Sequence, residues 1–179
     1  MELRVLVSIW GSAFVDVFLR WSLPSLLSDR NCRRILASGY HLTFYIYSDS
    51  TTLEYLRSSE VTTSAEGKQF KFFSMSETSF DDKPLDYGVK NNVGEINTHE
   101  LQSRCYMHGM EQLMGGEVVF LFWTADFVLS DGSLDWAMQQ INNGQNAVYA
   151  DYIEIKQESA ATELDGHYPT RGAGPSGRE

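Results

Sequence analysis

The chain has 179 residues, of which 42% are hydrophobic, and its formal net charge at pH 7 is −10. This apolar content excludes a disordered chain, and the length suits one hydrophobic core rather than two. The negative charge argues against general nucleic-acid binding, because an acidic surface repels the phosphate backbone.

The first half of the chain alternates strand-like and helix-like segments. Residues 3–10, LRVLVSIW, are apolar at most positions of both alternation sets, which predicts a strand buried on both faces of a parallel sheet. Gly11 ends this strand, and Ser12 is a candidate N-cap of a helix that Pro24 interrupts. The remaining elements of this half are a strand, a short helix and a strand, over residues 41–50, 51–59 and 68–73.

The second half opens with a polar stretch and then returns to the alternation. Residues 74–94 show no clear periodicity, and a loop of that length in a compact domain is usually functional or mobile. Asn97 is the predicted N-cap of a helix, because Glu100 follows at the spacing of a capping box. The elements that follow are a strand, a helix and a strand, over residues 117–123, 134–141 and 145–155.

This order predicts an α/β fold with a doubly wound, mostly parallel, Rossmann-like sheet in a single domain over residues 1–155. Residues 156–179 contain few large apolar side chains and a Gly/Pro/Ser cluster. They are predicted to form a flexible tail, or to mark the place where a longer protein was cut.

The cysteines and the N-terminal segment indicate a compartment. Cys32 and Cys105 are the two cysteines of the chain, which is too few for a disulfide framework, so a reducing compartment is the simplest interpretation. Residues 1–27 are hydrophobic but carry charges, and they match neither a signal peptide nor a membrane span. We therefore expect a cytoplasmic protein without a transmembrane segment.

Two aspartates follow predicted strands. Asp126 leaves the most hydrophobic segment of the chain, FLFWTADFVL, and Asp49 follows the second strand. In an open parallel sheet, ligands bind beyond the carboxyl ends of the strands, where the strand order reverses. We expect both carboxylates to face one crevice, where they would suit a hard divalent cation that bridges phosphates.

Four short stretches carry a resemblance to a known family: WG near the start, LPSLL after the first helix, a second strand ending in Ser-Asp, and FLFWTADFVLSDGSL. In this order they resemble the nucleotide-sugar-binding half of a GT-A-type glycosyltransferase, and more narrowly bacterial glycosyltransferase-like proteins. The resemblance spans residues 3–155. It implies a nucleotide-diphosphate sugar over the strand ends and an Asp-x-Asp motif that holds Mn²⁺ or Mg²⁺.

The resemblance implies a role for Asp126 as the metal or ribose contact. Thr124 stands where the first acid of the Asp-x-Asp motif would be. One carboxylate binds a metal more weakly than two, so the departure puts metal dependence in question. A metal-independent role for Asp126 therefore stays open.

The resemblance also implies four further contacts with the donor. Trp10 and Gly11 would lie along the nucleotide, and Asp49 would lie near the base. Arg104, on the helix before the fourth strand, would reach the diphosphate, because its permanent charge and fork geometry suit phosphate.

Structural roles compete with these functional ones. Asp126 could simply end a strand, and Asp49 equally suits a capping turn. Asp131, which precedes an amphipathic helix, is better explained as its N-cap than as a catalytic group. Arg104 lies off the apolar stripe of its helix, where solvated arginines are common.

The first functional hypothesis is a glycosyltransferase, or its donor-binding domain, that transfers a sugar from a nucleotide-diphosphate donor to an unknown acceptor. The second is a non-catalytic acidic α/β binding or assembly module, favoured by Thr124 and by the lack of a convincing base in residues 127–179. A nucleotidyltransferase is weaker, because WGSAFVD lacks a Gly-rich basic loop. Serine-hydrolase, dinucleotide-binding and P-loop motifs are missing from the sequence.

Overall fold

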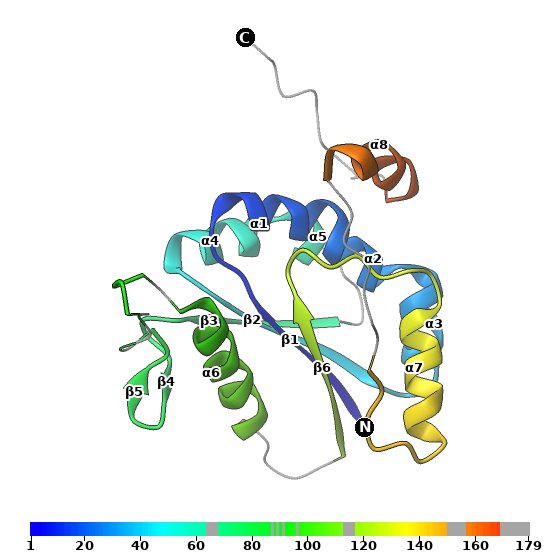
Figure 1. Cartoon of the computed structure of the whole chain (residues 1–179). Coiled ribbons are helices and arrows are strands. Elements are labelled where there is room, and N and C mark those ends of the chain that lie inside the picture. The colour runs from blue at the N-terminus through cyan, green and yellow to red at the C-terminus, as the bar shows by residue number, and fades with distance from the viewer. Residues whose placement is uncertain are drawn as a thin grey trace.

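The computed structural model describes residues 1–63, 68–86, 88, 90, 92–95, 97–112, 117–149 and 157–168. Within these residues the centre is a parallel sheet of four strands in the order β3-β2-β1-β6, with helices on both faces (Figure 1). The strands are β1 (Glu2–Ser8), β2 (His41–Ser48), β3 (Lys68–Ser74) and β6 (Val118–Thr124). The predicted α/β fold with a parallel, Rossmann-like sheet is confirmed.

The connections between these strands contain the other elements. The elements from β1 to β3 are α1 (Ser12–Val17), the π-helix η1 (Phe18–Ser22), α2 (Leu23–Leu27), α3 (Asp29–Ala37), α4 (Ser50–Ser58) and α5 (Glu60–Thr63). The later elements are β4 (Ser79–Phe80), β5 (Lys83–Pro84), α6 (Thr98–Glu111), α7 (Ser133–Asn142) and α8 (Gln157–His167).

Each face of the sheet carries its own hydrophobic cluster. The first cluster lies under α1 to α4 and α7. Its buried strand residues are Leu3, Val5, Val7, Ile9, Leu42, Phe44 and Ile46. On the opposite face, Leu6, Tyr45 and Tyr47 pack with Leu101 and Cys105 of α6. Both faces of β1 and β2 are therefore buried, which is why their sequences are apolar at nearly every position.

The order of the strands explains why α6 covers the second face. The chain moves outward from β1 to β2 and β3, and then returns past β1 to place β6 on its other side. Because such crossovers are almost always right-handed, reversing the direction of travel moves the connecting helix to the opposite face. The sheet is therefore doubly wound, and its order reverses between β1 and β6.

A glycine allows α6 to lie close against β1. A Cβ atom on Gly109 would lie 2.6 Å from Cδ2 of Leu6 and 3.1 Å from Oη of Tyr47. The Gly109 carbonyl accepts a hydrogen bond of 2.9 Å from Nη1 of the buried Arg4. Only a residue without a side chain permits this approach.

Pro24 changes the first helix rather than ending it. The helical run continues from α1 through the π-helix η1 into α2, with Pro24 at the start of α2. A proline ring clashes with the carbonyl four residues earlier, and a wider π turn avoids that clash.

The long polar stretch contains more structure than its sequence predicted. β4 and β5 pair as an antiparallel hairpin within residues 74–94. Asp81 and Asp82 form its turn with φ angles of 54° and 58°, which short polar side chains tolerate better than most residues. Leu85, directly after the hairpin, is fully buried against the second face.

The last predicted strand is wrong for the residues that can be compared. Residues 145–149 form no strand, and residues 150–155 lie outside the described part of the chain. The N–H of Gln145 donates to the Gln140 carbonyl at 3.1 Å, so the turn that follows α7 includes the first residue of the segment predicted as a strand. Tyr149, predicted to lie in that strand, is 85% exposed.

Part of the segment predicted as a tail contains secondary structure. Residues Gln157–His167 form α8. The Asp165 carboxylate accepts from Nε of Arg20 and from Nε1 of Trp21, each at 2.8 Å. Polar contacts with η1 hold this helix, and a search for apolar periodicity cannot detect them. None of the helices in the described ranges is both long enough and apolar enough to cross a membrane.

Candidate functional site

A cavity of about 270 Å³ lies where the carboxyl ends of β1 and β6 meet the N-terminus of α6. These two strands are the neighbours between which the strand order reverses, which is where open parallel sheets bind ligands. The volume is slightly below the roughly 300–1,000 Å³ of typical small-molecule sites, so the cavity suits a small ligand or one part of a larger ligand.

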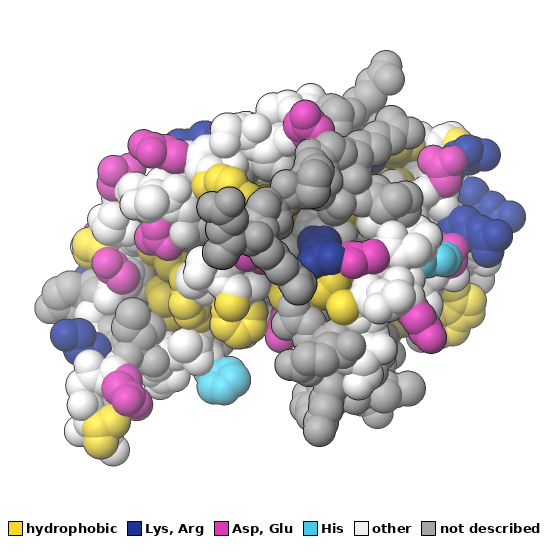
Figure 2. Space-filling model, turned by 90° about the horizontal axis from the view of Figure 1, so that it is seen from above, with side chains coloured by type: hydrophobic (Ala, Val, Ile, Leu, Met, Phe, Trp, Pro, Cys, Tyr) yellow, Lys and Arg dark blue, Asp and Glu magenta, His cyan; other side chains and the backbone are white. Residues whose placement is uncertain are grey.

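Four elements supply the walls of this cavity. The end of β1 contributes Ser8 and Trp10, and α1 contributes Phe14. The first turns of α6 contribute Thr98, His99 and Gln102, and the end of β6 contributes Thr124 and Asp126. Figure 2 shows the molecule from above, with hydrophobic side chains grouped on this side and acidic side chains spread around them.

The composition of the lining limits the ligand. Among the residues that the structure describes, it contains one carboxylate, that of Asp126, and no lysine or arginine. Trp10 and Phe14 provide aromatic surface, and hydroxyl and amide groups provide hydrogen bonds. Such a wall suits an uncharged ring with hydroxyl groups. Any phosphate charge must be met by main-chain N–H groups or by a bound cation.

Gly11 shapes the β1 side of the cavity. Its φ angle is +85°, a left-handed conformation that side chains rarely adopt. Its carbonyl accepts from the N–H groups of Phe14 and Val15, so this residue ends β1 and begins α1. Gly11 therefore acts through the backbone, by placing Trp10 and Phe14 on the same cavity.

A tight turn after β6 presents Asp126. The Phe127 N–H donates to the Thr124 carbonyl at 3.1 Å, which closes a turn around Ala125 and Asp126. Ala125 is buried in the first cluster, whereas Asp126 is exposed and lines the cavity. The structure thus brings the predicted contacts Trp10 and Asp126 to one site.

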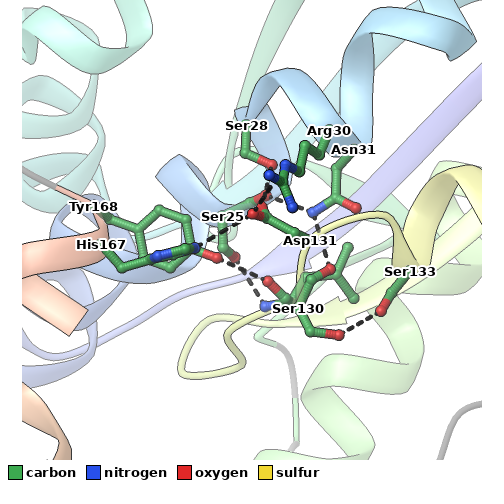
Figure 3. Close-up of polar contacts among 10 residues, drawn as sticks. Ser25, Ser28, Arg30, Asn31, Ser130, Asp131, Ser133, His167 and Tyr168 are labelled. Carbon is green, nitrogen blue, oxygen red and sulfur yellow. Dashed lines mark hydrogen bonds and ion pairs between the residues drawn. The ribbon is translucent and has the colours of Figure 1, made fainter. Parts of the chain in front are cut away.

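A buried polar network holds the loop that follows this turn (Figure 3). Oγ of Ser25 accepts from the Leu129 N–H at 2.9 Å. The fully buried Asn31 donates from Nδ2 to the carbonyls of Ser25 at 2.9 Å and Ser130 at 3.3 Å, and its Oδ1 accepts from the Leu134 N–H. Residues of α2 and α3 therefore fix the segment between Asp126 and α7.

Asp131 belongs to this network and does not cap α7. Gly132, with a φ angle of +81°, occupies the N-cap position, so the prediction for Asp131 is wrong. The Asp131 carboxylate accepts from Oγ of Ser28 at 3.3 Å and pairs with Arg30 at 3.6 Å and His167 at 3.4 Å. The Ser-Asp-Gly-Ser-Leu stretch is therefore explained by the packing of this loop.

Asp49 caps α4 and does not line the cavity. Its carboxylate accepts from the Thr52 N–H at 2.9 Å and from the Thr52 hydroxyl at 2.7 Å. Burial on its own raises the pKa of the Asp49 carboxyl, but these hydrogen bonds outweigh that effect and leave the pKa below its usual value. β1 separates β2 from β6, so Asp49 and Asp126 follow strands that are not neighbours.

Arg104 also has a structural contact. Its Nη2 donates to the Pro84 carbonyl at 2.8 Å and so ties the β4–β5 hairpin to α6. The side chain is not part of the cavity lining. Its position on α6 was predicted, but the hairpin that it contacts was not.

Three polar residues of this region were not singled out in the sequence. Ser8 ends β1, and its buried hydroxyl lies beside the Tyr106 hydroxyl, where it opposes the rise that burial causes in the pKa of that phenol. Nε2 of Gln102 donates to the Tyr106 hydroxyl at 2.8 Å, and that hydroxyl donates to the Trp123 carbonyl at 2.9 Å. For Ser8, the available signal in the sequence was a serine at the end of an otherwise apolar strand.

Asp126 belongs to no cluster of metal-ligating side chains in the part of the chain that the structure describes. In the described ranges, no three His, Cys, Asp or Glu side chains come together as a metal site. Asp126 would thus supply one ligand to Mn²⁺ or Mg²⁺, and phosphate oxygens and water would supply the others, as is usual for Mg²⁺.

Comparisons with known proteins give no family for the chain. Protein-family models, curated proteins and solved structures were each searched, and none of them matches.

Proposed function

We propose that this chain binds a nucleotide-diphosphate sugar and acts as a glycosyltransferase, or as its donor-binding part, with an unidentified acceptor. The observation that carries the proposal is a cavity at the reversal point of a parallel sheet, lined by Trp10 and Asp126. Sites at such a point bind nucleotides in many α/β proteins because strand ends and helix N-termini converge there.

The lining supports the nucleoside or sugar part of such a donor. The indole ring of Trp10 offers a flat apolar surface to a base or a sugar ring. Gln102 and Asp126 can accept from hydroxyl groups, and a few placed polar groups are what orients a ligand in a mostly apolar pocket.

Asp126 has two roles compatible with this donor. It accepts from the ribose hydroxyls, or it holds a divalent cation against the diphosphate. In sugar transfer an acceptor hydroxyl attacks the anomeric carbon, the bond from that carbon to the diphosphate oxygen breaks, and negative charge grows on the leaving diphosphate. A cation at this place would stabilise that charge.

Calorimetry with a panel of nucleotide-diphosphate sugars, in the presence of Mn²⁺ and in EDTA, tests the proposal. We expect one donor to bind the wild-type protein and to bind Asp126→Asn at least about tenfold more weakly, as expected for one lost charged hydrogen bond. Glu54→Gln, an exposed acid on α4, is the matched control and should bind like the wild type. Absence of binding by every donor would refute the proposal.

A non-catalytic binding module is the second candidate. The specific observation in its favour is that the cavity lining holds one carboxylate and one histidine, neither of them with an acidic partner in the lining. Donor binding without detectable hydrolysis or transfer of the sugar would select this candidate over the enzyme.

A further inference from the structure

β6 forms one edge of the sheet, and its sequence carries no charge. Within the described ranges β6 pairs with β1 alone, so its outer side has no strand partner there. An edge strand presents a row of main-chain N–H and C=O groups that can pair with another strand. The sequence of β6, VVFLFWT, adds apolar side chains on both faces of this edge.

The opposite edge of the sheet carries the charges that usually protect such strands. β3 contains Lys68 and Lys71, and lysines on an edge strand discourage pairing with another chain. Nζ of Lys71 donates to the Tyr45 hydroxyl at 2.9 Å, and the Arg57 guanidinium lies 5.4 Å from the centre of the Phe72 ring. β6 lacks any charged residue, so we expect its edge to be covered by a partner.

The side chains of β6 leave an apolar surface beside this edge. None of residues 118–122 is buried, whereas β1 and β2 are buried at nearly every position. Phe122 is 49% exposed, and its ring packs against that of Tyr106 on α6, with the ring centres 5.2 Å apart. Met107, next to Tyr106, is 47% exposed. Apolar surface that stays exposed in this way marks an interaction site.

The handedness of the fold argues against a partner strand from the connection that follows β6. α1 to α3 connect β1 to β2 across the first face, and α7 lies on that same face. Right-handed crossovers on one face all move in one direction, so a parallel strand after α7 would be directed from β6 towards β1, where the position is taken. The Tyr40 hydroxyl, just before β2, donates to Asn142 at the end of α7, so α7 ends near the amino ends of the strands. A strand added outside β6 from there would be parallel and would need a rare left-handed crossover.

We propose that β6 is the interface of a homodimer, in which a second copy of this chain pairs its own β6 antiparallel to the first. Pairing of all seven residues Val118–Thr124 places Leu121 on the twofold axis, so Phe120 lies opposite Phe122 of the second copy. Aromatic cross-strand pairs of this kind stabilise antiparallel strands.

Charge favours a second copy as the occupant of this edge. Each copy has a formal net charge of −10, so two copies repel each other over much of their surface. The uncharged strand is a place where they can meet, and an identical strand sets no like charges opposite each other. β6 also holds no charge that would select a different, charged partner.

The size of the interface limits its strength. One strand and the α6 side chains beside it belong at the small end of specific interfaces, which is roughly 1,200 Å² in total. We therefore expect a dissociation constant in the micromolar range, and a dimer that dissociates on dilution.

Analytical ultracentrifugation from about 1 to about 500 μM protein tests the proposal. We expect Phe122→Lys to weaken dimerisation about tenfold, because each dimer loses two aromatic pairs and gains two lysines at the edge. Tyr55→Lys, at an exposed aromatic residue of α4, adds the same charge away from β6 and should dimerise like the wild type. A wild-type protein that stays monomeric throughout, or a dimer that Phe122→Lys leaves unchanged, would overturn the proposal.

Salt provides a readout that distinguishes this interface from one built on ion pairs. Between about 50 and 500 mM NaCl, association through an uncharged strand should strengthen, because salt screens the repulsion between two acidic chains. Association that weakens with salt would show that ion pairs hold the dimer and would contradict the role of β6.

Hydrogen exchange locates the interface without a substitution, and it decides the question if Phe122→Lys fails to fold. Amides of residues 118–124 should exchange more slowly at concentrations where the dimer forms than at high dilution, because pairing engages their outward N–H groups. β3, the charged edge, is the internal control and should exchange equally at both concentrations. Protection of β3 in place of β6 would overturn the proposal.

This inference does not depend on the proposed function. Dimerisation through β6 without binding of any nucleotide sugar would keep the interface and refute the donor site. Donor binding by a protein that stays monomeric would do the reverse.

Discussion

Tyr47 on β2 and His108 on α6 meet between the sheet and the helix, with Oη of Tyr47 2.9 Å from Nδ1 of His108. Nε2 of the same ring lies 3.2 Å from Nε2 of Gln112. Both ring nitrogens of His108 are therefore engaged. The ring also packs edge-on against Phe73 and Tyr47, which leaves little room for a hydrated charge.

This contact predicts a stability that depends on pH. Burial lowers the pKa of His108 below its ordinary value of 6.5, although Glu111 opposes the change. Below about pH 6.5 the unfolded chain therefore binds a proton that the folded protein resists. We expect the free energy of unfolding to decrease as the pH falls from about 7 towards 5, and His108→Gln to flatten that slope. Urea unfolding at a series of pH values measures how the free energy of unfolding changes with pH. Equal slopes in the wild-type protein and in His108→Gln would contradict the lowered pKa of His108.

Gly109 predicts a steric effect at the interface of α6 and β1. In Gly109→Ala, the new methyl group must displace Leu6 or Tyr47, and overpacking of this kind costs about 1–3 kcal/mol. Gly166→Ala on α8 is the control, because no atom lies within 4 Å of its added Cβ. Urea unfolding should show a lower midpoint for Gly109→Ala alone, and equal midpoints would contradict the close packing.

The hydrogen bonds of Asn31 predict how much the free energy of unfolding falls when the network that holds the loop after Asp126 is broken. Asn31→Ala leaves the buried Leu134 N–H and the Ser25 carbonyl without their partner, so we expect a loss of at least about 2 kcal/mol in the free energy of unfolding. Asn143→Ala, at an exposed position after α7, should change it little. Chemical denaturation of both variants is the measurement. Similar stabilities would show that the network contributes little.

The hydrogen bonds of Asp165 predict that its replacement loosens α8 locally and leaves the stability of the whole protein nearly unchanged. Its hydrogen bonds with Arg20 and Trp21 hold its pKa below the usual value and attach α8 to η1. Exposed ion pairs contribute little to global stability, so Asp165→Asn should leave the melting temperature nearly unchanged. Hydrogen exchange in residues 157–168 should become faster, and an unchanged exchange rate would mean that other contacts hold α8.

The sequence predicted the central sheet well, for a physical reason. β1 and β2 are buried on both faces, so nearly every residue in them is apolar and the pattern stands out. The segment after α7 misled the same method. Residues 145–155, QNAVYADYIEI, are rich in β-branched and aromatic residues like a strand, but the signal of Asn143-Gly144 at the helix end does not say how far the turn extends.

The candidate site was only partly predictable. Trp10 and Asp126 follow from the rule that ligands bind at strand ends, and that rule needs only the order of the elements. Asp49 obeys the same rule in sequence, yet a capping bond engages it. Arg104 was expected from the family resemblance alone, and a hairpin carbonyl engages it. Whether Ser8 has a partner depends on side chains about a hundred positions away, and no local pattern records such contacts.

The network around Asn31 has a wider consequence, because it attaches the loop after β6 to the helical layer of α2 and α3 and not to the strands. Asp126 itself is set by the turn from Thr124 to Phe127, whereas the loop beyond it takes its position from helices that contribute nothing to the cavity lining. The β6 side of the cavity is thus built on two layers of the fold, with the sheet placing the carboxylate and the helices placing the segment behind it.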